Sequence, residues 1–162
     1  MALHDCFIAL GSNLGDREEN LRTAVEKLRL LPSTRLLKIS AWLENEPVGG
    51  PTGQGRYLNG VVHLQTELSP QELMKSLQRI EAEMGRPSRR IRWGPRIIDL
   101  DLLSCGDIVL TSPNLNLPHP RLHERPFVLA PLAEIEPAWL HPLFQKTAVQ
   151  LLNDLSCRSS GG

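Results

Sequence analysis

The chain has 162 residues, a length that predicts one domain large enough to bury a core without disulfides or structural metals. Its 18 basic and 18 acidic residues give a formal net charge of zero, which argues against a general nucleic-acid or membrane binder. Charged residues make up 22% and apolar residues 41% of the chain, as in ordinary globular proteins.

The N-terminal segment and the cysteines predict a cytoplasmic protein. No basic stretch followed by a long apolar run opens the chain, so we expect no signal peptide, and no segment approaches the length of a membrane span. Cys6, Cys105 and Cys157 lack the spacing of a metal site. Because Cys6 and Cys105 lie in apolar runs, we expect them to be small core residues.

Three strands and two helices are predicted in the first half of the chain. Apolar runs and alternating patterns place the strands at 6–10, 35–43 and 57–68. The segment 44–56 is rich in glycine and proline, so we expect a mobile loop.

Both helices of this half have capping signals. Asp16 precedes Glu19 by three residues, an acidic variant of the capping box. Ser69 followed by Pro70 and Glu72 is the stronger signal, because it combines an N-cap serine, a first-turn proline and a capping-box glutamate. Apolar residues at helical spacing follow each start.

The second half predicts further elements of both kinds. In order, they are a strand at 97–103, a turn at 105–107 into a hairpin strand at 108–110, a loop at 112–126 and helices at 127–135 and 147–155. Helices interleave with antiparallel-type strands, so the sequence predicts one α+β domain over residues 1–157. We expect residues 158–162 to be a disordered tail.

Asp99 and Asp101 are the sharpest local feature. Residues two apart in a strand face the same side, so both carboxylates project together while Leu100 and its neighbours at 98 and 102 face the core. Two such carboxylates repel each other unless a cation lies between them, and Mg²⁺ binds one or two carboxylates with phosphate oxygens and water. The alternative is a solvent-facing strand edge with paired charges.

Five arginines precede this pair in an eleven-residue segment that contains no acid. They are Arg86, Arg89, Arg90, Arg92 and Arg96. Guanidinium groups can bind phosphate oxygens bidentately, so the arginines and aspartates together favour a polyphosphate–Mg²⁺ site. A solvated arginine loop, or arginines that merely neutralise the aspartates, is the alternative.

Other polar side chains are further candidates for binding residues when they are considered together with the arginines and aspartates. Tyr57 and Asn59 share one strand face. An aromatic ring beside a carboxamide is suited to bind a flat heterocycle that forms hydrogen bonds. The alternative is a core tyrosine with a structural asparagine. Gln78 and Glu81 share a helix face and alone indicate surface polar residues. His119, between two prolines, suits either a phosphate contact or the capping of a turn.

Taken together, these segments resemble the 6-hydroxymethyl-7,8-dihydropterin pyrophosphokinase family of folate biosynthesis. The resemblance covers roughly residues 5–137 and is most specific in RWGPRIIDLDLL followed by LPHPRLHERPFVLAPL. It implies a ferredoxin-like α+β domain, mostly antiparallel sheet with helices packed on its faces. It also implies transfer of pyrophosphate from ATP to the hydroxymethyl group of the pterin, with release of AMP.

The resemblance implies a role for residues in each part of the site. Asp99 and Asp101 would hold two Mg²⁺ ions beside the catalytic-loop arginines Arg86, Arg92 and Arg96. The ATP-contacting positions are Gln78, Arg89, Trp93, Asn116, His119 and Arg125, with Glu81 at the boundary between helix and site. The pterin-contacting positions are Asn45, Val48, Tyr57, Asn59 and Phe127.

Four positions depart from the family pattern. Asn45 replaces a usual threonine, Ser88 and Asn114 stand where arginine is common, and Pro120 replaces an aromatic residue. We expect a monomer whose only partners are ATP and the pterin, without nucleic acid or membrane. From the residues alone, the rival functions are a nucleic-acid module that uses the arginine-rich loop and a metal-dependent phosphohydrolase.

Overall fold

The computed structural model describes residues 3–45, 56–85 and 97–161, the last four without side chains. A five-stranded sheet forms its centre, in the order β2-β4-β1-β5 with β3 also paired to β4, and all these pairings are antiparallel. The strands are β1 (His4–Ser12), β2 (Thr34–Ile39), β3 (Leu43–Asn45), β4 (Tyr57–Thr66) and β5 (Asp99–Cys105). The predicted α+β class is confirmed.

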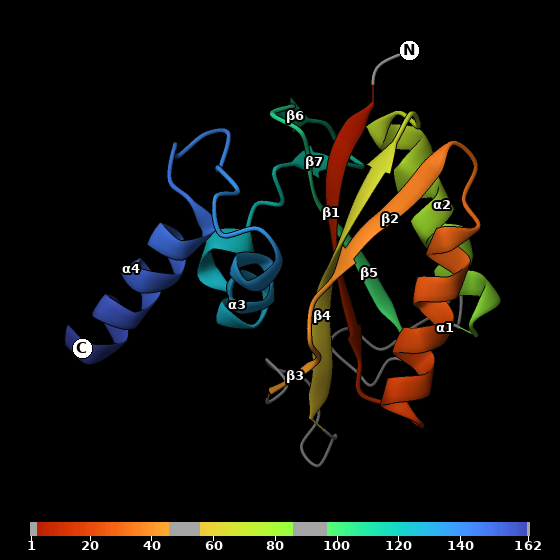
Figure 1. Cartoon of the computed structure of the whole chain (residues 1–162), viewed down its shortest axis with the longest axis horizontal. Coiled ribbons are helices and arrows are strands. Elements are labelled where there is room, and N and C mark those ends of the chain that lie inside the picture. The colour runs from red at the N-terminus through yellow and green to blue at the C-terminus, as the bar shows by residue number, and fades with distance from the viewer. Residues whose placement is uncertain (1–2, 46–55, 86–96, 162) are drawn as a thin grey trace.

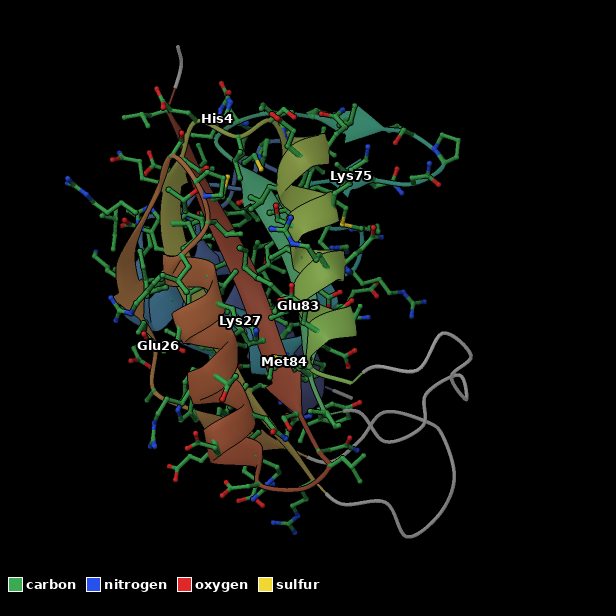
Figure 2. All side chains as sticks on the ribbon, turned by 90° about the vertical axis from the view of Figure 1, so that its right-hand side faces the viewer. His4, Glu26, Lys27, Lys75, Glu83 and Met84 are labelled. Carbon is green, nitrogen blue, oxygen red and sulfur yellow. The ribbon has the colours of Figure 1, made fainter. Side chains whose placement is uncertain are left out.

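Helices cover both faces of this sheet (Figure 1). They are α1 (Arg17–Arg29) and α2 (Pro70–Glu83) on one face, and α3 (Pro126–Ile135) and α4 (Ala148–Gly161) on the other. Figure 2 shows α1 and α2 side by side, where Lys27 Nζ lies 3.3 Å from Glu83 Oε1. None of the described helices has the length and hydropathy of a membrane span.

The capping signals read from the sequence are confirmed. The Asp16 carboxylate accepts a hydrogen bond from Glu19 N at 3.1 Å. Ser69 and Glu72 cap each other reciprocally, since each side chain accepts a hydrogen bond from the other residue's backbone N. Gly85, with φ +93°, follows the end of α2 in a left-handed conformation that glycine adopts without strain.

Two hydrophobic clusters hold the layers together. The first lies under α1 and α2 and includes Leu21, Leu28, Leu73, Leu77, Ile98, Leu100 and Leu102. The second lies under α3 and α4 and includes Phe7, Val61, Leu103, Leu129, Leu132 and Trp139. Ile98, Leu100 and Leu102 are therefore core residues, as the alternation around the aspartates predicts.

Cys6 and Cys105 also belong to the first cluster, as predicted. They are cross-strand partners on β1 and β5, and their sulfurs lie 3.1 Å apart as free thiols. The hydrogen bond to Cys105, together with burial, raises the pKa of the Cys6 thiol. Both groups thus act as small apolar core residues.

The predicted hairpin after Cys105 is wrong. Gly106 makes the turn with φ +55°, but the strand that follows, β6 (Leu110–Thr111), pairs with β7 (Asn116–Leu117). At the edge of β5 that faces away from β1, the Leu100 amide is bonded to the Glu81 side chain of α2 and not to a hairpin strand. The predicted loop 112–126 accordingly contains β7 and the short helix η1 (Leu122–Glu124).

Two other boundaries differ from the prediction. The strand predicted at 35–43 is divided into β2 and β3, because the Val61 amide is bonded to the Ser40 hydroxyl in place of a backbone carbonyl, while Ser40 N donates to Val61 O. Helix α4 continues to Gly161, through most of the predicted tail. No proline or earlier glycine interrupts this segment, so the helical hydrogen bonds propagate along it.

Candidate active site

Asp99 and Asp101 lie side by side on one face of β5. Both are half-buried, while Leu100 between them points into the first hydrophobic cluster. In the pairing with β1, Asp99 is opposite Gly11 and Asp101 is opposite Ala9. The predicted common direction of the two carboxylates is therefore confirmed, and the interior strand β1 lies beside them.

Tyr57 and Asn59 approach the same place from β4. The Tyr57 hydroxyl donates a hydrogen bond to Asp99 Oδ2 at 3.5 Å, across the intervening strand β1. Asn59 is opposite Gly11, where an added Cβ would lie only 2.8 Å from Asn59 Oδ1 and 3.4 Å from the Tyr57 ring. Glycine at position 11 thus lets both side chains lie over β1.

The Asn59 carboxamide is the clearest sign of a ligand. The residue is 8% exposed, and its Nδ2 is buried without a hydrogen-bond partner in the described part of the chain. A buried donor that lacks an acceptor costs about 1–3 kcal/mol, so such groups are rare in folded proteins. The cost is recovered if a bound molecule supplies an acceptor.

His119 joins the loop after β7 to this site. Its backbone N donates to Leu103 O at 2.8 Å, and its Nδ1 accepts from Arg121 N at 3.2 Å, so the predicted turn cap is present. Burial lowers the pKa of His119, an effect that Asp101 opposes and that Arg125 reinforces. The same histidine therefore lies within the electrostatic reach of Asp101 and Arg125.

The first turn of α3 adds a cation and a ring. Arg125 is the N-cap residue of the helix, and Pro126 occupies its first position, where the missing N–H costs nothing. The Arg125 guanidinium carbon lies 6.0 Å from the centroid of the Phe127 ring.

Glu81 is buried next to the aspartates, so the surface position that its spacing alone indicates is wrong. It is 7% exposed, and its Oε2 accepts a hydrogen bond from Leu100 N at 2.9 Å. The signal was present, because Glu81 follows Leu77 by four residues and so belongs to the buried stripe of α2. Only the fold shows which amide it meets.

The remaining predicted site residues divide into two groups. Asn45 is the last residue of β3 and lies opposite Tyr57. Gln78 on α2 and Asn116 on β7 are exposed. Asn114 and Pro120, which depart from the family pattern, are exposed as well. The predictions that lie outside the described residues concern Val48, Arg86, Ser88, Arg89, Arg90, Arg92, Trp93 and Arg96.

The two aspartates fit a magnesium ion that is shared with a phosphate ligand. In the described ranges, no cluster of three or more His, Cys, Asp or Glu side chains is placed to hold a metal by itself. Mg²⁺ does not need such a cluster, since it takes one or two carboxylates and completes its shell with phosphate oxygens and water. Oxygen donors on one strand face match that requirement.

Comparison with known sequences agrees with this geometry. A family model described as 7,8-dihydro-6-hydroxymethylpterin-pyrophosphokinase matches residues 7–137. Similar proteins named 2-amino-4-hydroxy-6-hydroxymethyldihydropteridine pyrophosphokinase occur in Synechocystis, 42% identical over 95% of this chain and 77% of the relative, and in Bacillus subtilis, 48% identical over 80% and 76%.

Solved structures show the same fold. A Plasmodium falciparum HPPK-DHPS with pteroate matches 99% of this chain with a TM-score of 0.76 at 14% identity, and an A437G form with SDX-DHP matches 98% with a TM-score of 0.78. The chain spans less than half of these two larger proteins, 44% and 46%. The ferredoxin-like fold that the sequence resemblance implies is thereby confirmed.

Proposed function

The chain belongs to the 7,8-dihydro-6-hydroxymethylpterin-pyrophosphokinase family, and from this membership we propose how its residues divide the reaction between them. It is an enzyme of folate synthesis that takes ATP as co-substrate and a pterin as acceptor. In our proposal, the pterin hydroxymethyl oxygen attacks the β-phosphorus of ATP, the bond from that phosphorus to the AMP oxygen breaks, and AMP leaves.

The buried Nδ2 of Asn59 carries the assignment of the pterin subsite. We assign its hydrogen bond to an acceptor on the edge of the heterocycle. Tyr57 lies on the same strand face and supplies a ring for stacking, with Phe127 from α3 as the second ring and Asn45 and Val48 as further contacts. A carboxamide that forms hydrogen bonds to one edge of the pterin fixes the orientation of the pterin relative to Asp99.

Asp99 and Asp101 are the residues that would hold Mg²⁺, two ions in our proposal. When bound there with ATP, Mg²⁺ offsets the negative charge that repels the attacking alcohol. The chain itself orients this end of the site, since the Tyr57 hydroxyl donates a hydrogen bond to Asp99.

His119 and Arg125 are assigned to the nucleotide. Because burial lowers the pKa of His119, its ring is neutral near pH 7. Its Nδ1 accepts a hydrogen bond from Arg121 N, so the proton resides on Nε2, which is then a donor for a phosphate oxygen. Arg125 supplies a permanent positive charge beside it.

The other nucleotide and phosphate contacts come from the family pattern. We assign Arg86, Arg92 and Arg96 to the transferred phosphates, where positioned cations stabilise charge that develops during transfer. The further ATP contacts in this proposal are Gln78, Arg89, Trp93 and Asn116.

The test measures AMP in the presence of ATP and Mg²⁺, with and without 6-hydroxymethyl-7,8-dihydropterin. We expect AMP only when the pterin is present, whereas nucleotide cleavage without pterin would support a phosphohydrolase. Asp99→Asn should lower kcat about 100-fold or more. Asp107→Asn is the matched control, because Asp107 is an exposed carboxylate just beyond the same strand and should leave kcat unchanged.

We also propose a monomer in the cytoplasm. Sedimentation of the purified protein tests the monomer, and a sedimentation coefficient that rises with concentration would contradict it.

A further inference from the structure

Glu81 is a buried carboxylate at the junction of α2 and β5. It is 7% exposed, and burial of a charged group is costly unless hydrogen bonds offset the lost hydration. Its Oε2 accepts a hydrogen bond from the backbone N of Leu100 at 2.9 Å. A side chain of one layer is thus bonded to the backbone of the next.

The amide that Glu81 binds belongs to an edge strand. In the described sheet, β5 is the last strand of the order β2-β4-β1-β5 and has β1 as its neighbour. Successive residues of an antiparallel strand direct their amides to opposite edges, so Leu100 directs its N–H away from β1 and toward α2. Glu81 takes the place that a carbonyl of a further strand would have.

Leu100 is the residue between Asp99 and Asp101. Each aspartate is joined to it by one peptide unit, so the orientation of the Leu100 amide affects the pleat on both sides. The two carboxylates point to the same face and repel each other, which favours distortion of an edge strand that has no anchor. An acceptor on the Leu100 amide opposes that distortion.

We propose that Glu81 is a positioning residue, which anchors the Leu100 amide and thereby holds Asp99 and Asp101 at the spacing needed for Mg²⁺ and the phosphates of ATP. The inference rests on the function proposed above. A role as third metal ligand is not supported, because the described residues contain no group of three such side chains around one point.

Two substitutions separate anchoring from charge. Glu81→Gln keeps an oxygen that can accept from Leu100 N, whereas Glu81→Ala removes the acceptor. We expect E81A to lower kcat about 10–100-fold and to raise the Mg²⁺ concentration for half-maximal activity, with a smaller change in the pterin KM. E81Q should retain most of the wild-type kcat and Mg²⁺ response.

Glu83→Ala is the matched control. Glu83 lies two residues further along α2, is half-exposed and pairs with Lys27 (Figure 2). Its loss removes one carboxylate from the same helix without touching β5, so kcat and the Mg²⁺ response should stay at the wild-type level. If E81A fails to fold, Glu81→Asp replaces it, since the shorter side chain withdraws the acceptor.

Hydrogen exchange measured by NMR on the metal-free protein gives a second readout. The Leu100 amide should exchange faster in E81A and remain protected in E81Q and E83A, while amides of the interior strand β4 keep their protection. The proposal would be overturned if the Leu100 amide exchanged at the wild-type rate in E81A. It would also be overturned if E81Q kept the amide protected and were nevertheless as inactive as E81A. A wild-type protein without pterin-dependent AMP formation would instead overturn the proposed function, and the exchange experiment would still decide whether Glu81 is the anchor.

Discussion

Gly11 affects the candidate site through the side chain that it lacks. Tyr57 and Asn59 lie over it from β4, and an added Cβ would be 2.8 Å from Asn59 Oδ1. That distance is shorter than van der Waals contact, so the carboxamide or the strand must move. The Asn59 Nδ2 would then leave the position from which we propose that it binds the pterin.

Gly11→Ala should therefore weaken pterin binding selectively. We expect the pterin KM to rise about tenfold, which corresponds to the loss of about one well-placed hydrogen bond, with little change in the ATP KM. Steady-state kinetics with each substrate varied in turn measures this. Equal rises of both KM values in G11A would contradict the prediction.

At this scale, local spacing was predictable and cross-strand partners were not. The common face of Asp99 and Asp101 follows from the two-residue period of a strand, and so does that of Tyr57 and Asn59. The roles of Gly11 and Glu81 depend on which residue comes opposite them in space. The spacing of residues along the sequence does not predict which residues become neighbours across the sheet or between a helix and a strand.

Among the elements, α2 connects the first core cluster to the site. Its N-terminus is fixed by the reciprocal bonds of Ser69 and Glu72, and its C-terminal part carries Glu81. Hydrogen bonds from Ser69 lower the pKa of the Glu72 carboxyl below its ordinary value of 4.5. Because the folded-state pKa is the lower one, this interaction stabilises the protein above pH 4.5 and is lost as the pH falls through the folded-state pKa.

Ser69→Ala should lower the free energy of unfolding by about 1 kcal/mol at neutral pH. The side chain in Glu72→Gln cannot ionise. The free energy of unfolding of this variant should therefore fall less than that of the wild type as the pH is lowered. Urea unfolding followed by circular dichroism, at neutral pH and below pH 4.5, measures both effects. An E72Q protein with the same dependence on pH as the wild type would contradict the assignment.

The predictability of the elements follows the range of the interactions that form them. Helices α1 and α2 have capping residues within four positions of their starts, and both were predicted. The pairing of β6 with β7 was not, since the Cys105–Asp107 turn equally suits a hairpin on β5. In the structure the Leu100 amide at this edge of β5 is bonded to Glu81 of α2 instead, a partner that the local turn signal does not reveal.

For the whole molecule, the two hydrophobic clusters are joined through shared strands. Strands β1, β4 and β5 direct alternate residues into each cluster, so neither cluster can separate without breaking the sheet. Trp139 adds a polar link, because its Nε1 donates to Ser104 Oγ at 3.0 Å in the interior. We therefore expect the domain to unfold cooperatively.

Leu73→Ala and Leu129→Ala test this expectation from opposite faces. Both leucines are fully buried, one in each cluster, and each substitution should cost about 2–5 kcal/mol. Calorimetry should show a single transition at a lower temperature in both variants. Separate transitions for the two faces would show that the layers unfold independently.

Helix α3 and its N-cap residue carry both proposed substrate contacts and interior groups. Arg125 and Phe127 lie at its beginning, and Leu129 and Leu132 fill the second cluster one or two turns later. A closely packed interior transmits displacements, so a change in leucine packing also moves the ring and the guanidinium. A substitution that is selected for thermal durability in this helix therefore also changes the placement of the proposed substrate contacts, so the two properties evolve together here.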